Sequence, residues 1–293
     1  IRQLLPYYSN AEFNDTIKAQ AYELLDIVEK THPKEANAYS IYADFLYRDK
    51  KLMEAKEKYS KSLEIDKDKM AIWSQVLFIE SQLNDYNSMV KDSKEAMELF
   101  PNDPIAFFFN GVSNMQLNDN KAAINSLKKG VELVIDNKTL ESQFYANLGD
   151  AYYRDKQMTK SDSAYEMALE INPKDTYVLN NYSYYLSLRN VNLEKAESMS
   201  RKANDLEPNN GNSQDTYAWI LYAEAKYVEA KEWIEKALLN GGDKNAVILE
   251  HYGDILFKLN EKNKALEYWM KAKEAGKGSD FLEKKINEKT LFE

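Results

Sequence analysis

Small residues recur along this chain at a nearly constant interval. The first series advances by 34, 34, 34, 38, 35, 34 and 35 positions through Ala21, Ala55, Met89, Ala123, Ser161, Ala196, Ala230 and Ala265. A second series follows seven residues behind it, at Val28, Ser62, Ala96, Gly130, Ala168, Ala203, Ala237 and Ala272. A repeat of this length is typical of an array of similar units that contact only their neighbours.

A third series precedes the first by 12 residues, or once by 13. Its members are Ala43, Leu77, Gly111, Gly149, Ser183, Ala218 and Gly253. Two helices can approach closely only where the side chains at their crossing point are small. The three series therefore predict a pair of tightly crossed helices in each unit, with large apolar residues beside each crossing.

The pattern resembles the tetratricopeptide repeat family, whose unit is a 34-residue helix-turn-helix. The best match carries Tyr145, Leu148, Gly149, Tyr152, Ser161, Tyr165, Ala168, Leu169 and Pro173 on the family's positions. The resemblance covers roughly residues 15 to 276. It implies an all-α fold, an α-solenoid in which stacked antiparallel helix pairs form a right-handed superhelix.

We expect seven tandem units over residues 36–278, beginning near 36, 70, 104, 142, 176, 211 and 246. Residues 1–35 are interpreted as a partial or degenerate N-terminal repeat. Residues 279–293 are expected to form a capping helix that begins with a capping box of Asp280 and Glu283, its lysines and glutamates facing solvent. The first residue is Ile1, which is typical of a processed or excised chain.

Two departures from the period predict local geometry. Four extra residues after Gly130 predict that the helix ending near Ile135 runs longer or turns more widely. Gly241 and Gly242 lengthen another turn, where a left-handed backbone conformation favours glycine.

Charge and composition exclude several classes of function. The net charge of −9 disfavours nucleic-acid binding, which depends on clustered lysine and arginine. The absence of cysteine excludes disulfides, thiol catalysis and cysteine metal sites. No apolar run reaches the ~20 residues that span a bilayer.

The sequence offers no catalytic constellation. The two histidines, His32 and His251, are too far apart in sequence to form a metal-binding pair, and an isolated histidine is most simply structural. A phosphate-binding glycine loop, a nucleophile elbow and an HExxH motif are all missing. We therefore predict no enzymatic activity, no cofactor and no metal.

The resemblance implies that a protein or peptide partner binds in a groove lined by the first helix of each pair. On the family's register the groove positions are Phe108, Phe109, Met115, Asn147, Asp150, Tyr153, Asn181, Tyr184, Trp219 and Tyr222. Aromatic side chains there suit apolar anchors, and asparagines suit the main chain of a ligand. The alternative, that some of these residues belong to the core, stays open.

Acid and base lie four residues apart at Asp44 and Arg48, Asp150 and Arg154, and Asp254 and Lys258. These are either intrahelical ion pairs or a charged stripe that selects charged ligands. The clamp that some family members use for a peptide's terminal carboxylates needs basic residues. The corresponding places hold Ser40, Asp44, Gln75, Ile105 and Phe109, so that clamp is not expected.

The preferred function is a protein-binding scaffold. The alternatives are a structural subunit that self-associates or docks through its edge or outer surfaces, homo-oligomers included, and a regulatory module of a larger protein. The residue usage resembles that of bacterial proteins. A cell-envelope location, with or without a lipid anchor, and a cytoplasmic one are equally compatible with a chain that lacks cysteine.

Overall fold

The computed structural model describes residues 15–292, and this part of the chain is helical and contains no strand. It divides into two compact units, the first ending at Gln157 and the second beginning at Met158. Each unit is described by itself. None of the helices in the described part combines the length and apolar character that crossing a membrane requires.

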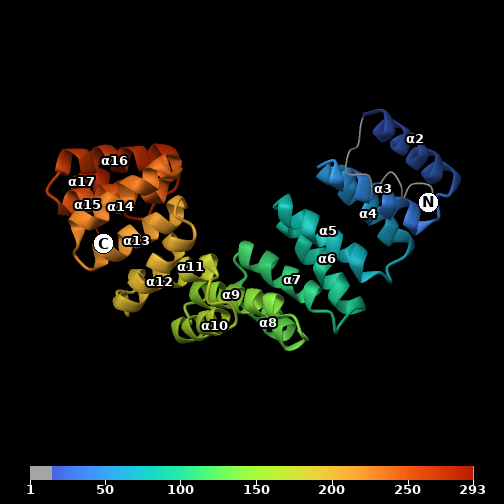
Figure 1. Ribbon diagram of the computed structural model, residues 1–293, viewed down its shortest axis with the longest axis horizontal. Coiled ribbons are helices and arrows are strands. Elements are labelled where there is room, and N and C mark those ends of the chain that lie inside the picture. The colour runs from blue at the N-terminus through green and yellow to red at the C-terminus, as the bar shows by residue number, and fades with distance from the viewer. Residues whose placement is uncertain (1–14, 293) are drawn as a thin grey trace. The chain divides into compact units, whose positions relative to one another are not determined.

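The first unit consists of α2 (Asp15–Thr31), α3 (Ala36–Arg48), α4 (Leu52–Ile65), α5 (Met70–Gln82), α6 (Tyr86–Leu99), α7 (Pro104–Gln116), α8 (Asn120–Glu132) and α9 (Lys138–Arg154) (Figure 1). Consecutive helices contact each other from α2 to α9. The first helices of successive pairs also touch, α5 with α7 and α7 with α9. These contacts make the unit a stack of helix pairs.

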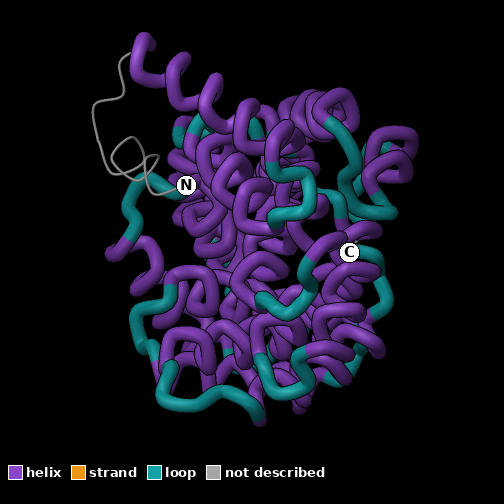
Figure 2. Tube along the Cα trace, turned by 90° about the vertical axis from the view of Figure 1, so that its right-hand side faces the viewer, coloured by secondary structure: helices purple, strands orange, loops and turns teal. Residues whose placement is uncertain are grey.

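The second unit consists of α10 (Met158–Ile171), α11 (Thr176–Leu188), α12 (Leu193–Leu206), α13 (Gly211–Ala223), α14 (Tyr227–Leu239), the 3₁₀ turn η1 (Gly242–Lys244), α15 (Ala246–Lys258), α16 (Lys262–Ala275) and α17 (Leu282–Glu288). Here α11, α13 and α15 contact one another in sequence, and short loops join the helices (Figure 2). The predicted all-α solenoid of antiparallel pairs is confirmed.

The tight turn inside each pair has a common backbone form. At least one residue adopts a left-handed conformation in each turn: Lys50, Asn84, Asn118, Lys156, Asn190 together with Asn192, Ala225 and Asn260. The next amide then reaches back over the helix end; for example, the N–H of Asp85 donates to the carbonyl of Glu80 at 2.9 Å. This bond pairs a carbonyl that the helix end would otherwise leave without a partner. The turn thus reverses the chain within three residues, or within four between α11 and α12.

The small residues lie where the helices cross. In the last pair, a Cβ atom on Gly253 would lie 2.4 Å from Cδ1 of Trp269 and 3.1 Å from the carbonyl oxygen of Ala265. A side chain cannot be added there without moving the buried Trp269 ring. The alanines of the first two series, including Ala168 and Ala237, are fully buried. The indole of Trp269 fills the space beside the crossing, as expected for the large residues.

Of the two expectations about departures from the period, the structure corrects one and confirms the other. The helix expected to end near Ile135 stops at Glu132, and the extra residues mainly lengthen the start of α9, which has 17 residues where α7 has 13. By contrast, Gly241 does adopt the predicted left-handed conformation, with φ of 95°.

The expected capping box at the C-terminal end is also wrong. The residue that precedes α17 is Phe281, and no side chain caps this helix. Glu283 instead pairs with Lys273 at 3.0 Å. The lysines of α17 do not all face solvent either, because Lys285 is buried. At the other end of the chain, residues 1–14 of the expected partial repeat lie outside the described residues, and α2 buries Ala21 and Leu25.

The crossing contacts predict the effect of added volume. Replacing Ala237 or Ala168 with leucine should overpack a crossing and lower the free energy of unfolding by about 1–3 kcal/mol. Chemical denaturation followed by helical circular dichroism measures the loss. Val228→Leu on α14, where the side chain is 65% exposed, is the matched control and should change stability by less than about 0.5 kcal/mol. Equal effects at Ala237 and Val228 would contradict the assigned crossing.

Candidate functional site

In the first unit, most of the predicted groove residues serve packing. Phe108 is half-buried and lies edge-on to Phe109 and Phe144, with ring centroids 5.8 Å and 5.2 Å away. Met115 and Asp150 are buried, so the expectation that they face a free groove is wrong. The reason is local: inner-helix side chains on this register are covered where the next helix packs against them.

The remaining polar and aromatic candidates of α9 and α11 are half-buried. The Asn147 amide donates to the carbonyl of Gln143 at 2.8 Å, within its own helix. The Asn181 side chain accepts a hydrogen bond from Asn180 at 3.2 Å. Tyr153 is half-buried on α9. The two asparagine amides thus already have local partners.

The second unit brings three predicted residues together. A cavity of about 640 Å³ is lined by Tyr184, Ser187, Leu188, Asn190, Trp219, Tyr222, Ala223, Tyr227, Val247, Glu250, His251, Asp254, Lys258, Gly278, Ser279, Phe281, Lys285 and Phe292. These residues come from α11 and the turn after it, α13, the start of α14, α15 and the segment around α17. Because α11, α13 and α15 are the first helices of successive pairs, the predicted Tyr184, Trp219 and Tyr222 share one wall region.

Aromatic rings stack along this wall. The Trp219 ring lies 4.6 Å from Tyr222 with 7° between their planes, and 4.0 Å from His251 with 17° between planes. Trp219 is half-buried, but Tyr222 is only 7% exposed, so the expected exposure of Tyr222 is wrong. Its ring is covered because it lies one turn along α13 from Trp219 and also contacts Tyr227.

The stacked His251 ring also forms a buried pair with a carboxylate. Nδ1 of His251 on α15 is 2.8 Å from the carboxylate of Asp215 on α13. Burial disfavours the charged imidazolium, but the Asp215 carboxylate, with Asp254 and Glu250 nearby, outweighs it and raises the pKa of His251. The folded protein therefore favours the protonated ring.

A buried lysine joins the C-terminal segment to α15. Nζ of Lys285 lies 2.8 Å from Glu250 and 2.7 Å from Asp254, and all three side chains are at most 5% exposed. Asp254 also accepts from the Trp269 indole at 2.8 Å, and Glu250 from the Ser279 amide at 2.7 Å. Burial raises the pKa of Asp254 to about 6 despite Lys285.

The burial of these carboxylates bears on whether acids and bases four residues apart form a charged stripe. Asp150 and Asp254 are buried, and Asp44 accepts a hydrogen bond from the Tyr59 hydroxyl. Carboxylates turned into the packing cannot form a charged stripe on the surface. Asp150 and Asp254 therefore do not form a charged stripe on open surface, although Asp254 and Lys258 both line the cavity.

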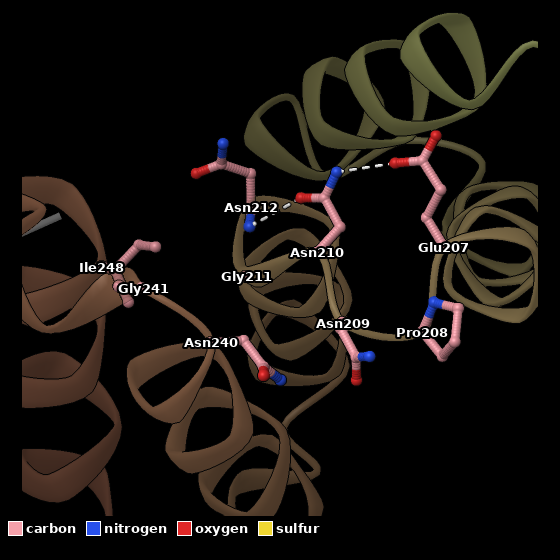
Figure 3. Close-up of a pocket in the computed structure, with 10 residues that line it drawn as sticks. Glu207, Pro208, Asn209, Asn210, Gly211, Asn212, Asn240, Gly241 and Ile248 are labelled. Carbon is pink, nitrogen blue, oxygen red and sulfur yellow. Dashed lines mark hydrogen bonds between the residues drawn. The ribbon is translucent and has the colours of Figure 1, made fainter.

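A second cavity, of about 540 Å³, lies beside the turn before α13 (Figure 3). The side-chain carbonyl of Asn210 accepts hydrogen bonds from the main-chain N–H groups of Asn212 and Ser213, and this caps α13. The side-chain NH₂ group of Asn210 donates to Glu207 at 2.8 Å. Asn240 donates to Gln214 at 2.9 Å. The polar groups here cap and connect helices, and aromatic residues do not line this cavity.

Sequence reasoning missed the polar half of the first cavity. It treated His251 as isolated, because Asp215 lies 36 positions away, one unit earlier. That separation is close to one period, and partners one period apart on first helices are a signal that the repeat spacing contains. It also treated Lys285 as a solvated residue, since a lysine in a charged terminal segment ordinarily is.

The raised pKa predicts a pH dependence of stability. His251 contributes its full stabilisation below the ordinary histidine pKa of about 6.5, and the contribution is lost as the pH rises through the higher pKa of the folded state. The stability difference between the wild type and His251→Gln should therefore be larger at pH 6 than at pH 9. Denaturant unfolding at both pH values measures it. A difference that grows with pH would show that the ring is buried neutral.

Removing the buried lysine should be costly. Lys285→Met leaves Asp254 and Glu250 buried without their cation, and breaking such a pair costs about 3–5 kcal/mol. Lys277→Met, at an exposed lysine of the same segment, is the control and should cost under about 0.5 kcal/mol. Thermal or denaturant unfolding compares the two. Similar small losses would mean that Lys285 is solvated in solution.

Comparisons with known proteins agree with this architecture. Residues 142–175 match the family model described as tetratricopeptide repeat. The human protein O-mannosyl-transferase TMTC3 is 23% identical over 159 residues, which is 54% of this chain. The match covers 17% of the length of that relative, so it concerns a small part of it.

Solved structures show the same fold. A tetratricopeptide repeat protein from Parabacteroides merdae has a TM-score of 0.68 at 14% identity, covering 87% of this chain and 98% of that one. The Cut9 and Hcn1 hetero-tetramer of the APC/C has a TM-score of 0.64 at 13% identity, covering 92% and 52%. At these identities the likeness concerns the fold alone. One repeat of this chain thus matches the tetratricopeptide repeat family model, and the described helices share the fold of solved tetratricopeptide repeat structures.

Proposed function

We propose that this chain is a non-catalytic binding protein and that the cavity lined by α11, α13 and α15 holds a peptide segment of a partner protein. The fold supports the class of function, because tetratricopeptide repeat proteins generally mediate protein–protein interactions. The Cut9 and Hcn1 structure is itself an assembly of two kinds of chain. A repeat array suits this role because its first helices offer one continuous surface.

The cavity is the observation that supports the location. Its volume of about 640 Å³ lies within the range of ligand pockets, roughly 300–1,000 Å³. Tyrosine, tryptophan and phenylalanine line it, and such residues contribute most of the binding energy in protein interfaces. Leu188 and Phe281 at its rim are 45% and 46% exposed, so apolar surface continues outward from the cavity.

The test begins with affinity capture of a partner by the full chain and continues with the purified pair. The double variant Tyr184→Ala, Phe281→Ala removes two rings from the cavity without touching the buried Tyr222. Loss of aromatic anchors should weaken binding by about 2 kcal/mol or more, roughly 30-fold in Kd. Isothermal titration calorimetry measures the change, and circular dichroism confirms that the helices are kept.

Met270→Ala on α16 is the matched control, because Met270 is 50% exposed but does not line the cavity. It should leave Kd unchanged. Equal affinity of the wild type and the double variant would place the binding surface elsewhere. A stable closed oligomer of the purified chain in which Phe281 is protected would favour the self-assembling subunit instead.

A further inference from the structure

Charges around the cavity of the second unit are balanced. The carboxylates of Glu250 and Asp254 and the ammonium groups of Lys258 and Lys285 line the cavity, and the carboxylate of Asp215 pairs with the His251 ring. Each carboxylate already accepts a hydrogen bond, from His251, from Lys285 and Ser279, and from Lys285 and Trp269. A charged ligand group would lose its hydration here without gaining a counter-ion, which is unfavourable.

The His251 ring offers a polar atom to a ligand. The His251 side chain is 9% exposed, its Nδ1 is held by Asp215, and no residue between 15 and 292 forms a hydrogen bond with its Nε2. Trp219 lies against the ring face at 4.0 Å, and Tyr184 lies 6.3 Å away. Because His251 lines the cavity, Nε2 is the atom that it can present there. In the protonated ring Nε2 carries a hydrogen and donates.

We propose that the cavity binds an uncharged segment of the partner: an aromatic or branched aliphatic side chain enters among Tyr184, Trp219 and Phe281, and a neighbouring main-chain carbonyl accepts a hydrogen bond from Nε2 of His251. This inference rests on the proposed function and adds the chemical class of the ligand. The aromatic lining matches the apolar side chain. A carbonyl oxygen matches a single N–H donor, and the bond gains strength from the positive charge on the ring.

The donor role makes binding depend on pH. A neutral ring that keeps its hydrogen on Nδ1, toward Asp215, would present a lone pair at Nε2 and repel a carbonyl. The groups that face the ring are Asp215 and Tyr222 on α13, Glu250, Asp254 and Lys258 on α15, Tyr184 on α11 and Lys285 on α17. The carboxylates favour the protonated form, so affinity should fall as the pH rises through the raised pKa of His251.

The probes are capped pentapeptides of the form acetyl-Gly-Ser-X-Ser-Gly-amide, with X as tryptophan, leucine, lysine or aspartate. They are titrated into the full chain while the histidine ring signals are followed by NMR. The chain has two histidines, so a His32→Gln variant assigns the His251 signals and serves as the matched control. The tryptophan and leucine peptides should shift His251 and bind at least tenfold more tightly than the lysine and aspartate peptides.

Two further arms test the hydrogen bond. Versions of the tryptophan peptide in which each main-chain carbonyl in turn is reduced to a methylene should include one that binds about tenfold more weakly, which corresponds to about 1.4 kcal/mol. The double variant His251→Phe, Asp215→Asn keeps a stacked ring but removes the donor and its counter-ion. It should weaken the tryptophan peptide about tenfold and abolish the pH dependence. The wild-type pH series keeps the test valid if this variant unfolds.

Several results would overturn the inference. They are tighter binding of the aspartate or lysine peptide, affinity that rises with pH, and no binding of the tryptophan and leucine peptides at millimolar concentration. If one of these results is found but the purified partner still binds the Tyr184→Ala, Phe281→Ala variant more weakly than the wild type, the inferred ligand class is wrong and the proposed function stands. If the partner also binds that variant as tightly as the wild type, both the inferred ligand class and the proposed function are wrong.

Discussion

Close contact between helix backbones at small residues is the interaction on which the rest of this structure depends. At Gly253 the backbone approaches Trp269 so closely that no side chain fits between them. Ala218 and Ser183, both fully buried, have the corresponding place in the two preceding pairs. Since each pair is fixed in this way, the first helices of successive pairs are held beside one another. The cavity of the second unit exists because α11, α13 and α15 keep that order.

Polar residues on those first helices are the second constraint. Asp215, Glu250 and Asp254 are buried, and burying a carboxylate is unfavourable unless it is paired. The structure supplies a partner from a later helix each time, with His251 on α15 for Asp215 and Lys285 on α17 for the other two. Contacts of this kind have strict geometry. They therefore fix the position of neighbouring helix pairs more narrowly than apolar packing alone would.

The repeat period predicted most of the fold. Small residues at fixed spacing predicted helix pairs because the spacing encodes a local contact, and Gly253 with Ala265 shows that contact directly. The left-handed turns at Asn84, Asn118 and Asn260 were not predicted, although asparagine tolerates that conformation. The site was only partly predictable. Trp219 and Tyr184 were predicted to line a groove, and they do line the cavity. The burial of Tyr222 and the pairing of Lys285 depend on contacts with other segments.

The most direct test of this account is a proton–proton distance at a crossing. In the nuclear Overhauser spectrum of the full chain, the indole Hδ1 of Trp269 should show a strong cross-peak to the α protons of Gly253, because the Trp269 Cδ1 atom occupies the space that a side chain at residue 253 would need. The chain has four tryptophans, so the assignment is practicable. Absence of that cross-peak in the folded protein would contradict the close crossing on which the helix pairs and the cavity both rest.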